Sequence, residues 1–484
     1  MFFNSFHFVA FFSVVWVLAV ALRHRVTSRN AVLLAASYYF YGCWDWRFLI
    51  LIVISTLVDY ICGRLFDVTE VDPEHPPPPS ARRKAILAVS VCTNLGLLGF
   101  FKYFDFFVES GAAFLAQLSM PVSPRTLGIV LPVGISFYTL QTLSYTIDLY
   151  RGQMKTERNL LHFALFVAFF PQLVAGPIER ARRLLPQLNA PTVCTLDKLY
   201  SGFYLMSWGM FKKVVLADNL GLVVDEIWAL DAPSGLAVVL GCHCFAFQLY
   251  CDFSGYSDIA RGAARCMGFE LMLNFNLPFL TTNPTDFWRN WHISLSSWLR
   301  DYLYYPLGGG RKGQVRSLVN IVLTMVVSGV WHGAGWPFLL MGLAYGVTLS
   351  AHKLARPYLA RVQPSARVAV SVWWLVRLVI TFELFTAPLI FFRSTTLDQV
   401  MLMLRSGAAQ LLPADWVVFS PWSTVFFWCA GSLMAMQVLQ FVSKDLDVVS
   451  RLPVPLRAAL YTAMMLGIIV FGVSGGTAFV YFQF

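Results

Sequence analysis

The chain has 484 residues, of which 57% are hydrophobic, 16% are aromatic and only 13% are charged. Because soluble domains carry about 25% charged residues, this composition excludes an ordinary globular protein and indicates an integral membrane protein. The formal net charge is +10, but the basic residues stand between apolar segments, which is typical of topology signals and of contacts with anionic membrane lipid and argues against nucleic-acid binding. We therefore expect an all-α polytopic membrane protein with residues 1–484 in a single membrane-embedded domain.

The N-terminal apolar segments predict the first crossings. Residues 6–22 have no basic residue before them and three arginines after them, the reverse of a signal peptide, so we expect a retained helix whose N-terminus lies outside. Residues 31–46 and 48–62 are expected to form two spans that meet at a turn. Residues 67–84 contain acidic residues, a run of prolines and a basic cluster, which predicts a flexible cytoplasmic loop.

Residues 159–178 are long enough to span a membrane, yet basic residues stand on both sides of them. Because the positive-inside rule favours both ends in the cytoplasm, we interpret this segment as re-entrant. The alternative is an ordinary span that violates the rule. By the same rule we expect the basic loops at 180–197 and 311–316 to be cytoplasmic.

Polar residues follow the apolar span expected over residues 232–251. Asp252, Tyr256 and Asp258 come directly after it, with Arg261 and Arg265 as possible ionic partners. Carboxylates at membrane depth need partners, so these groups either form a structural network or contact substrate. Counting all apolar segments, we expect about eleven transmembrane helices, plus re-entrant and interfacial helices around a central tunnel.

Residues 283–352 form the stretch that we interpret as the catalytic core. Asn283 can cap a helix that begins at Pro284, and the Pro306 and glycine run can end it, which predicts one helix over 284–305. On that helix His292 would lie on an apolar face with Trp288, and the tryptophans, tyrosines and arginines are typical of a membrane-interface helix.

The next segment, residues 317–352, carries no charge and is far longer than the ~20 residues of one crossing, so it is expected to cross, break and return. His332 lies inside it. Glycines around the histidine, together with Ser328 and Pro337, are expected to loosen the helix and make room for a ligand. An ionisable group at membrane depth is a functional candidate.

Most other kinds of site are absent from the sequence. There is no GxSxG, no HExxH and no phosphate-binding glycine loop before a helix, and the nine cysteines show no CxxC spacing. Cys242, His243 and Cys244 are adjacent, and neighbours on a helix point about 100° apart, so we expect no metal. What remains is two histidines in membrane segments, where burial favours the neutral imidazole, which is a general base.

Several long strings carry a family resemblance. In chain order they are PVGISFYTLQTLSYTIDLYRG from residue 132, FFPQLVAGPIER from residue 169, QLYCDFSGYSDIARG from residue 248, DFWRNWHISLSSWLRDYLYYPLGG from residue 286 and SGVWHG from residue 328. These strings resemble those of membrane-bound O-acyltransferases, in particular the alginate O-acetyltransferase-like bacterial branch. The resemblance extends to the closing FVYFQF at 479–484.

The resemblance implies an enzyme of the bacterial cytoplasmic (inner) membrane. His332 would be the general base, and His292 matches the family's second histidine, which orients the base or the donor or takes a direct part. A cytoplasmic thioester, acetyl-CoA, would reach His332 through a tunnel, and the acetyl group would leave on the outer face. An exported or membrane-anchored acetyltransferase partner would then complete O-acetylation of a polysaccharide acceptor.

The candidate site includes further residues. We assign to the substrate path or tunnel Trp331, Asn290, Trp298, Asp252, Tyr256, Asp258 and Tyr481. For Tyr481 two interpretations stay open, a transient acyl carrier and an aromatic anchor at the membrane interface. The competing class of function is a transporter or flippase of a lipid-linked or small polar substrate, because broken segments with buried polar groups also describe transport pathways.

Overall fold

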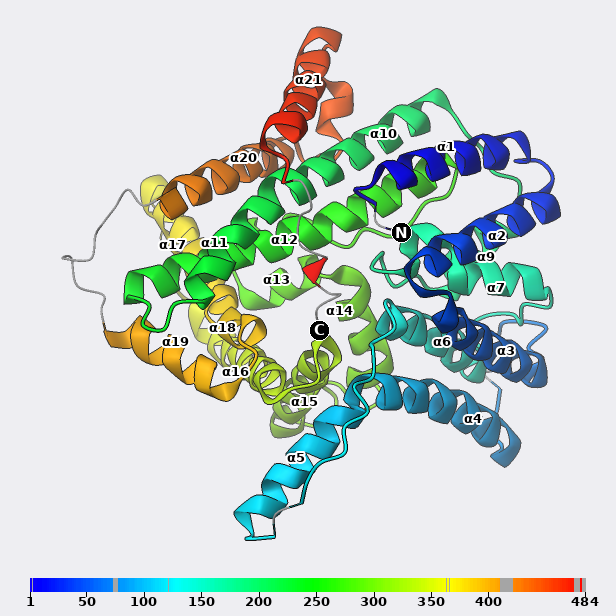
Figure 1. Ribbon diagram of the computed structural model, residues 1–484, viewed down its shortest axis with the longest axis horizontal. Coiled ribbons are helices and arrows are strands. Elements are labelled where there is room, and N and C mark those ends of the chain that lie inside the picture. The colour runs from blue at the N-terminus through cyan, green and yellow to red at the C-terminus, as the bar shows by residue number, and fades with distance from the viewer. Residues whose placement is uncertain are drawn as a thin grey trace. The chain divides into compact units, whose positions relative to one another are not determined.

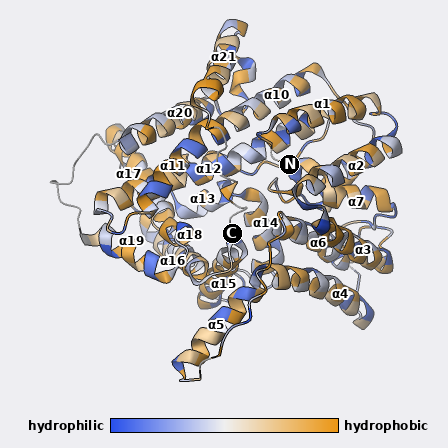
Figure 2. Ribbon diagram, in the orientation of Figure 1, coloured by the Kyte–Doolittle hydropathy of each residue, from blue (hydrophilic) through white to orange (hydrophobic). Residues whose placement is uncertain are grey.

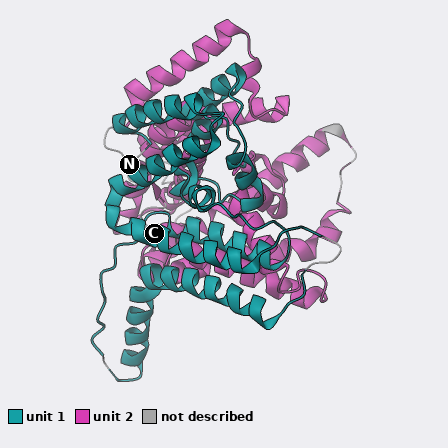
Figure 3. Ribbon diagram, turned by 90° about the vertical axis from the view of Figure 1, so that its right-hand side faces the viewer, with its two compact units in different colours: residues 1–206, 259–272 teal, residues 207–258, 273–484 magenta. Residues whose placement is uncertain are grey.

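A computed structural model describes residues 1, 3–72, 77–120, 122–362, 364, 366–409, 421–473 and 479–480. These residues form helices and no strand. They pack into two compact units (Figure 3): Met1–Met206 with Ile259–Met272, and Ser207–Asp258 with Leu273–Phe484. The expectation of a single membrane-embedded domain over residues 1–484 stays a prediction.

The first unit holds the N-terminal helices, labelled in Figure 1. Their bounds are α1 Phe6–Ala21, α2 Val26–Asp45, η1 Trp46–Phe48, α3 Leu49–Phe66, α4 Ala81–Leu98, the π turn η2 Gly99–Tyr103, α5 Phe104–Gln117, α6 Ile135–Tyr150, α7 Leu160–Ala168, α8 Phe170–Leu173, α9 Ala181–Leu188 and most of α10 Leu196–Phe211. The turn expected between the second and third spans is confirmed at η1. Helix α4 begins at Ala81, so the last residues of the loop expected over 67–84 are helical, and residues 73–76 of that loop lie outside the described residues.

A buried polar network joins α3, α4 and α6 in the first unit. Asp59 accepts hydrogen bonds from the Ser90 hydroxyl (2.5 Å) and the Asn94 amide (2.8 Å), and Ser55 donates to Asn94 (2.7 Å). Thr142 on α6 also donates to Asn94. Because a buried carboxylate is costly without partners, this network fixes how the three helices pack.

The segment at 159–178 does not form one spanning helix. Helices α7 and α8 are separated at Phe169, and their residues from Phe163 onward are all buried. An ordinary span, which was the alternative, would be one continuous helix, and re-entry from the cytoplasmic side stays a prediction.

The second unit contains the C-terminal helices (Figure 1). Their bounds are the π turn η3 Lys212–Ala217, α11 Asp218–Trp228, α12 Gly235–Cys266 up to Asp258, η4 Pro278–Leu280, α13 Pro284–Asn290, α14 Ile293–Leu299, the π turn η5 Arg300–Tyr304, α15 Gln314–His332, α16 Trp336–Leu359, α17 Arg367–Thr386, α18 Leu389–Arg393, α19 Leu397–Ala409, α20 Pro421–Ser443, η7 Val448–Arg451 and α21 Val454–Phe471.

Helices α15 and α16 form the hairpin that the sequence predicts over 317–352, with the break at Gly333–Gly335. Their backbones touch. A Cβ on Gly342 would overlap the Met325 carbonyl oxygen and lie 2.8 Å from the Cα of Val326. This contact requires glycine, and it fixes the spacing of the two helices.

The prediction of one helix over 284–305 is wrong. Helix α13 ends at Asn290 and α14 begins at Ile293, with His292 between them in a left-handed conformation (φ 41°, ψ 55°). Trp288 and His292 therefore do not share a continuous helix face. The periodic pattern continues through the break because both short helices bury one side.

Eight helical segments among the described residues are long and apolar enough to cross a membrane, so the expected count of about eleven is not confirmed. One of these segments, Val26–Phe66, contains the η1 turn between the two spans that the sequence predicts there. Another, Ala81–Gln117, contains the π turn η2. Figure 2 shows hydrophobic residues over most of these helices. Large apolar side chains such as Ile469 and Val442 are exposed on them, as expected for surfaces that face lipid.

Candidate active site

The fold brings His292 and His332 together in the second unit. Their ring centroids lie 6.4 Å apart, and the two side chains are 1% and 8% exposed. His332 is the last residue of α15, directly before the extended Gly333, so the end of the helix presents it. The sequence pointed to both histidines separately, and the structure places them in one site.

Asn274 supports the unusual backbone at His292. Its carbonyl accepts from the Ile293 N–H (2.8 Å), and its side-chain oxygen accepts from the Ser294 hydroxyl (3.0 Å). Its amide in turn donates to the Ser257 hydroxyl of α12 (3.2 Å). A left-handed non-glycine residue is strained and persists only where its surroundings impose it. Sequence reasoning missed Asn274, because a lone asparagine in a loop carries no signal of its own.

Aromatic rings enclose His292. Phe253 meets it edge-on at 4.5 Å, Phe275 stacks at 6.5 Å and Trp331 lies at 5.8 Å between centroids. Burial, with a smaller contribution from His332, holds the pKa of His292 well below its usual range. Its imidazole is therefore neutral at physiological pH.

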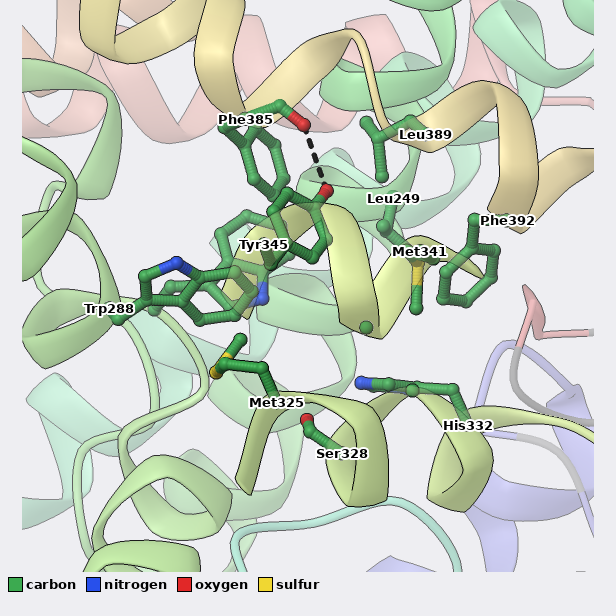
Figure 4. Close-up of a pocket in the computed structure, with 13 residues that line it drawn as sticks. Leu249, Trp288, Met325, Ser328, His332, Met341, Tyr345, Phe385, Leu389 and Phe392 are labelled. Atoms are coloured by element: carbon green, nitrogen blue, oxygen red, sulfur yellow. Dashed lines mark hydrogen bonds between the residues drawn. The ribbon is translucent and has the colours of Figure 1, made fainter. Parts of the chain in front are cut away.

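A narrow apolar cavity lies against His332. Figure 4 shows the ring of His332 with a nitrogen directed into it. The centre of a water molecule can occupy about 20 Å³ of this space, which is room for little more than one water. The lining comes from α12, α13, α15, α16, α17 and α18 and from Trp291, and consists of Leu249, Trp288, Trp291, Met325, Ser328, Gly329, His332, Met341, Gly342, Tyr345, Phe385, Leu389 and Phe392.

A larger cavity of about 690 Å³ lies farther along α13, α16 and α17. Its cationic side chains are Arg289, Arg356 and Arg377, with His352 and Asp286 beside them. Arg377 donates to the Thr282 carbonyl (3.2 Å), and Arg289 pairs with Asp286 (3.1 Å). The arginines make this cavity suited to an anionic group, and apolar residues of α16 and α17 cover the rest of it.

An aromatic cluster stands where the same three helices pass from one cavity to the other. Trp288 meets Tyr345 edge-on at 4.9 Å, and Tyr345 stacks on Phe385 at 6.1 Å. The Tyr345 hydroxyl donates to the Phe385 carbonyl at 2.8 Å, which ties α16 to α17 (Figure 4). Their neighbours Arg289, Thr348 and Leu384 line the larger cavity.

Asp252 belongs to a buried ionic network. Lys213 lies 2.7 Å from Asp252 and 2.8 Å from Asp218, and the second Asp252 oxygen accepts from the Val480 N–H at 2.7 Å. The partner is a lysine, whereas Arg265 pairs with Glu270 in the other unit. The carboxylate thus has the network contacts that were one of its two interpretations, and a substrate contact stays a prediction.

Asp258 and Tyr256 lie on the same part of α12. Asp258 pairs with Lys212 at 2.7 Å, and Lys212 also donates to the Ser254 hydroxyl (2.9 Å). The ring of Tyr256 packs against Phe479 at 5.1 Å. The signal that could have revealed these pairs is Lys212–Lys213 itself, two adjacent lysines directly after an apolar segment.

The remaining predicted residues differ in their positions. Trp331 packs on His332 at 5.0 Å between ring centroids. The Asn290 amide donates to the Asp286 carbonyl (2.8 Å), and Trp298 packs on Tyr302 at 4.9 Å, but neither residue lines the cavity beside His332. Tyr481 lies outside the described residues.

No group of three His, Cys, Asp or Glu side chains in the described part of the chain could hold a metal ion. In the Cys242–Cys244 triplet, His243 instead lies 2.9 Å from a Glu383 oxygen.

The comparisons with known proteins agree on one family. The model of the membrane-bound O-acyltransferase family matches residues 154–392, a range that includes every residue lining the two cavities. A probable alginate O-acetylase AlgI of Azotobacter vinelandii is 40% identical over 391 residues, 81% of this chain and 74% of the relative. A peptidoglycan O-acetyltransferase of Helicobacter pylori is 34% identical over 402 residues (77% and 72%), and a teichoic acid D-alanyltransferase of Bacillus subtilis is 28% identical over 234 residues (46% and 58%).

Proposed function

The chain belongs to the membrane-bound O-acyltransferase family, and from that premise we propose that it transfers acetyl from cytoplasmic acetyl-CoA across the bacterial inner membrane for O-acetylation of an exported or cell-surface polysaccharide. The relatives named for alginate and peptidoglycan O-acetylation support a glycan acceptor. A separate exported or membrane-anchored acetyltransferase completes the transfer.

His332 is the general base of this proposal. Its imidazole takes the proton of an acceptor hydroxyl while the hydroxyl oxygen attacks the thioester carbonyl carbon. The C–S bond then breaks, and the imidazolium returns the proton to the leaving thiolate. The observation that carries the proposal is that His332 directs a ring nitrogen into a cavity that is too narrow for bulk water.

Two neighbours assist the base. His292, neutral and held by Asn274, sets the position of His332 and of Trp331 between them. Ser328 stands one turn before His332 on α15 and presents its hydroxyl to the same cavity. That hydroxyl is a donor for the negative charge that develops on the thioester oxygen.

The larger cavity provides the path for the donor. Coenzyme A carries phosphate groups, and Arg289, Arg356 and Arg377 are the side chains that bind such groups best. The pantetheine arm would pass the aromatic cluster of Trp288, Tyr345 and Phe385 to reach His332. These three rings line the smaller cavity and their chain neighbours Arg289, Thr348 and Leu384 line the larger one, so a displacement of the rings would open a tunnel between the two.

The C-terminal segment is proposed as the exit. Phe479 packs on Phe253, whose ring contacts His292, so the described tail lies two rings from the histidine pair. Tyr481 follows Val480 directly and would carry the acetyl group to the partner, with an interfacial anchor as the other interpretation of this residue. Family membership favours this enzyme over the transporter that the sequence left open.

The test uses purified protein in detergent with acetyl-CoA. We expect slow release of free coenzyme A or acetylation of the C-terminal peptide, because a base beside a thioester activates water as well as an alcohol. His332→Ala should abolish both, whereas His24→Ala, an exposed histidine of the other unit, should abolish neither. Flux of a solute in proteoliposomes without any turnover of acetyl-CoA would replace the enzyme by a transporter.

A further inference from the structure

We infer that the cavity beside His332 selects the acyl group by its length, and that Leu389 and Met341 set the limit at two carbons. This inference rests on the proposed function, because it assumes that the acyl group of the donor enters that cavity. The aromatic cluster and the larger cavity hold the rest of the donor, so the acyl chain is the part that must fit next to the base.

The chemistry of the cavity suits a hydrocarbon chain. Apart from His332 and Ser328, its side chains are apolar or aromatic, and Leu249, Met341 and Leu389 are all nearly fully buried. A carbonyl placed at His332 and Ser328 would direct its alkyl end toward Met341, Leu389 and Phe392, which stand opposite those polar groups in Figure 4. Burial of the alkyl end there is favourable, and burial of a polar substituent is not.

The available space sets the length. The centre of a water molecule can occupy only about 20 Å³ of the cavity, so the cavity admits a group the size of one methyl. A propionyl or butyryl chain would have to displace a side chain from a packed wall, which costs free energy in proportion to the overlap.

The spacing of α15 and α16, which form one side of the cavity, is fixed by backbone contacts. On the α15–α16 side, Gly342 lies directly against the Met325 and Val326 backbone, and Gly329 lies against the Phe338 carbonyl. These are backbone contacts between two helices, and separating them would disrupt the hairpin. The backbone on this side of the cavity is therefore rigid.

The rest of the lining consists of side chains, contributed by Met341 from α16 itself and by Leu389 and Phe392 from α18. Phe392 is held between His332 (5.5 Å) and Phe338 (5.4 Å), so its truncation would also loosen the base. Leu389 and Met341 carry no aromatic ring and contribute aliphatic volume to the cavity wall. Truncation of either residue enlarges the cavity and leaves the histidine pair in place.

The experiment measures His332-dependent thioester hydrolysis by the full-length protein with acetyl-, propionyl- and butyryl-CoA at equal concentration. Because one methylene changes kcat/KM by roughly 10–200-fold in a fitted pocket, the wild type should prefer acetyl over butyryl by about 100-fold or more. In Leu389→Ala and in Met341→Ala that ratio should fall at least about tenfold, with the butyryl rate rising. Leu433→Ala, which truncates an equally buried leucine of α20 that lines neither cavity, is the matched control and should keep the wild-type ratio.

Each variant is judged by the ratio of its kcat/KM values for acetyl-CoA and butyryl-CoA, so a partial loss of folded protein cancels from that ratio. A wild type that hydrolyses butyryl-CoA as fast as acetyl-CoA would overturn the inference and leave the proposed function intact. An unchanged ratio in both Leu389→Ala and Met341→Ala would also overturn it. No turnover of any thioester by the folded wild type would instead refute the proposed function, and this inference with it.

Discussion

The carboxylate of Asp252 accepts a hydrogen bond of 2.7 Å from the backbone N–H of Val480, which fastens the C-terminal segment to the middle of α12. Lys213 holds the other oxygen of Asp252 and is itself held by Asp218. Lys213, whose side chain is 12% exposed, thus connects the start of α11 to a tail 228 residues beyond Asp252.

Asp252→Ala should release the tail and reduce acetyl transfer to the partner relative to thioester hydrolysis. A hydrogen bond to a charged group is worth about 1.5–3 kcal/mol, so the transfer-to-hydrolysis ratio should fall about tenfold or more. Asp258→Asn is the control, because it breaks the Lys212 pair on the same helix without touching the tail. Alkylation of a cysteine at position 480, followed on its own peptide by mass spectrometry, should become faster in Asp252→Ala only. An equal rate in both variants would contradict the role of Asp252.

His332→Ala should abolish acetyl transfer while the protein still folds and inserts, because the reaction loses its base. His292→Ala should lower transfer by a variable amount, since His292 acts on the position of the base. Acetyl ester on the exported polymer is the measurement. Normal acetylation by a well-expressed His332→Ala protein would refute the central proposal.

The left-handed backbone at His292 predicts a difference between two substitutions. Glycine adopts φ 41° freely and alanine does not, so His292→Gly should be more stable than His292→Ala by roughly 1 kcal/mol. His292→Gly should therefore unfold at the higher temperature. Both lose the imidazole, and their activities should be similar. Thermal unfolding in detergent measures the first effect, and equal melting temperatures would mean that the conformation carries no strain.

Gly342→Ala should disrupt the α15–α16 hairpin, because the new methyl group would overlap the Met325 carbonyl oxygen. We expect a loss of about 1–3 kcal/mol, together with loss of activity through the displaced His332. Gly431→Ala on α20 is the matched control, since nothing lies within 4 Å of its Cβ position. That substitution should be neutral or slightly stabilising.

Glu179 predicts a pH dependence of stability. Burial, opposed by a hydrogen bond from the Met272 N–H and by nearby arginines, raises its pKa from 4.5 to about 7. The folded protein therefore binds more protons than the unfolded chain between these two pH values. The stability that Glu179 contributes is fully present below pH 4.5 and is lost as the pH rises through 7. Between these two values the loss is about 1.4 kcal/mol per pH unit. Melting temperatures of the wild type should fall from pH 5 to pH 8 relative to Glu179→Gln, and parallel curves would exclude Glu179 as the cause.

The orientation of the second unit can be tested at two loops. Lys353 near the end of α16 donates to Ser317 near the start of α15, so the loop at 311–316 and the basic residues at 353–361 lie at the same end of the hairpin. Both are predicted to face the cytoplasm. Single cysteines at 312 and 361 should resist an impermeant reagent added from outside, and labelling of either one would reverse the proposed orientation.

Part of the site could be predicted because the information is local. The apolar run at 317–352, with its glycines and Pro337, predicts a hairpin wherever it occurs, since each residue acts through its own backbone or hydropathy. The same run carries His332, and the break after it follows from Gly333. Burial of the histidine follows from the length of the run alone.

Composition and motifs were enough to establish a helical membrane protein with two histidines in apolar surroundings and the strings of its family. Which distant groups meet became known only from the folded chain: Asn274 with the broken backbone at His292, Lys213 with Asp252, and the aromatic cluster between two cavities. The 3.6-residue pattern continued across residues 284–305 because apolar residues mark burial and not the direction of the chain. Hydropathy predicts that a side chain is buried, but only the packing of helices far apart in sequence determines which side chains it contacts.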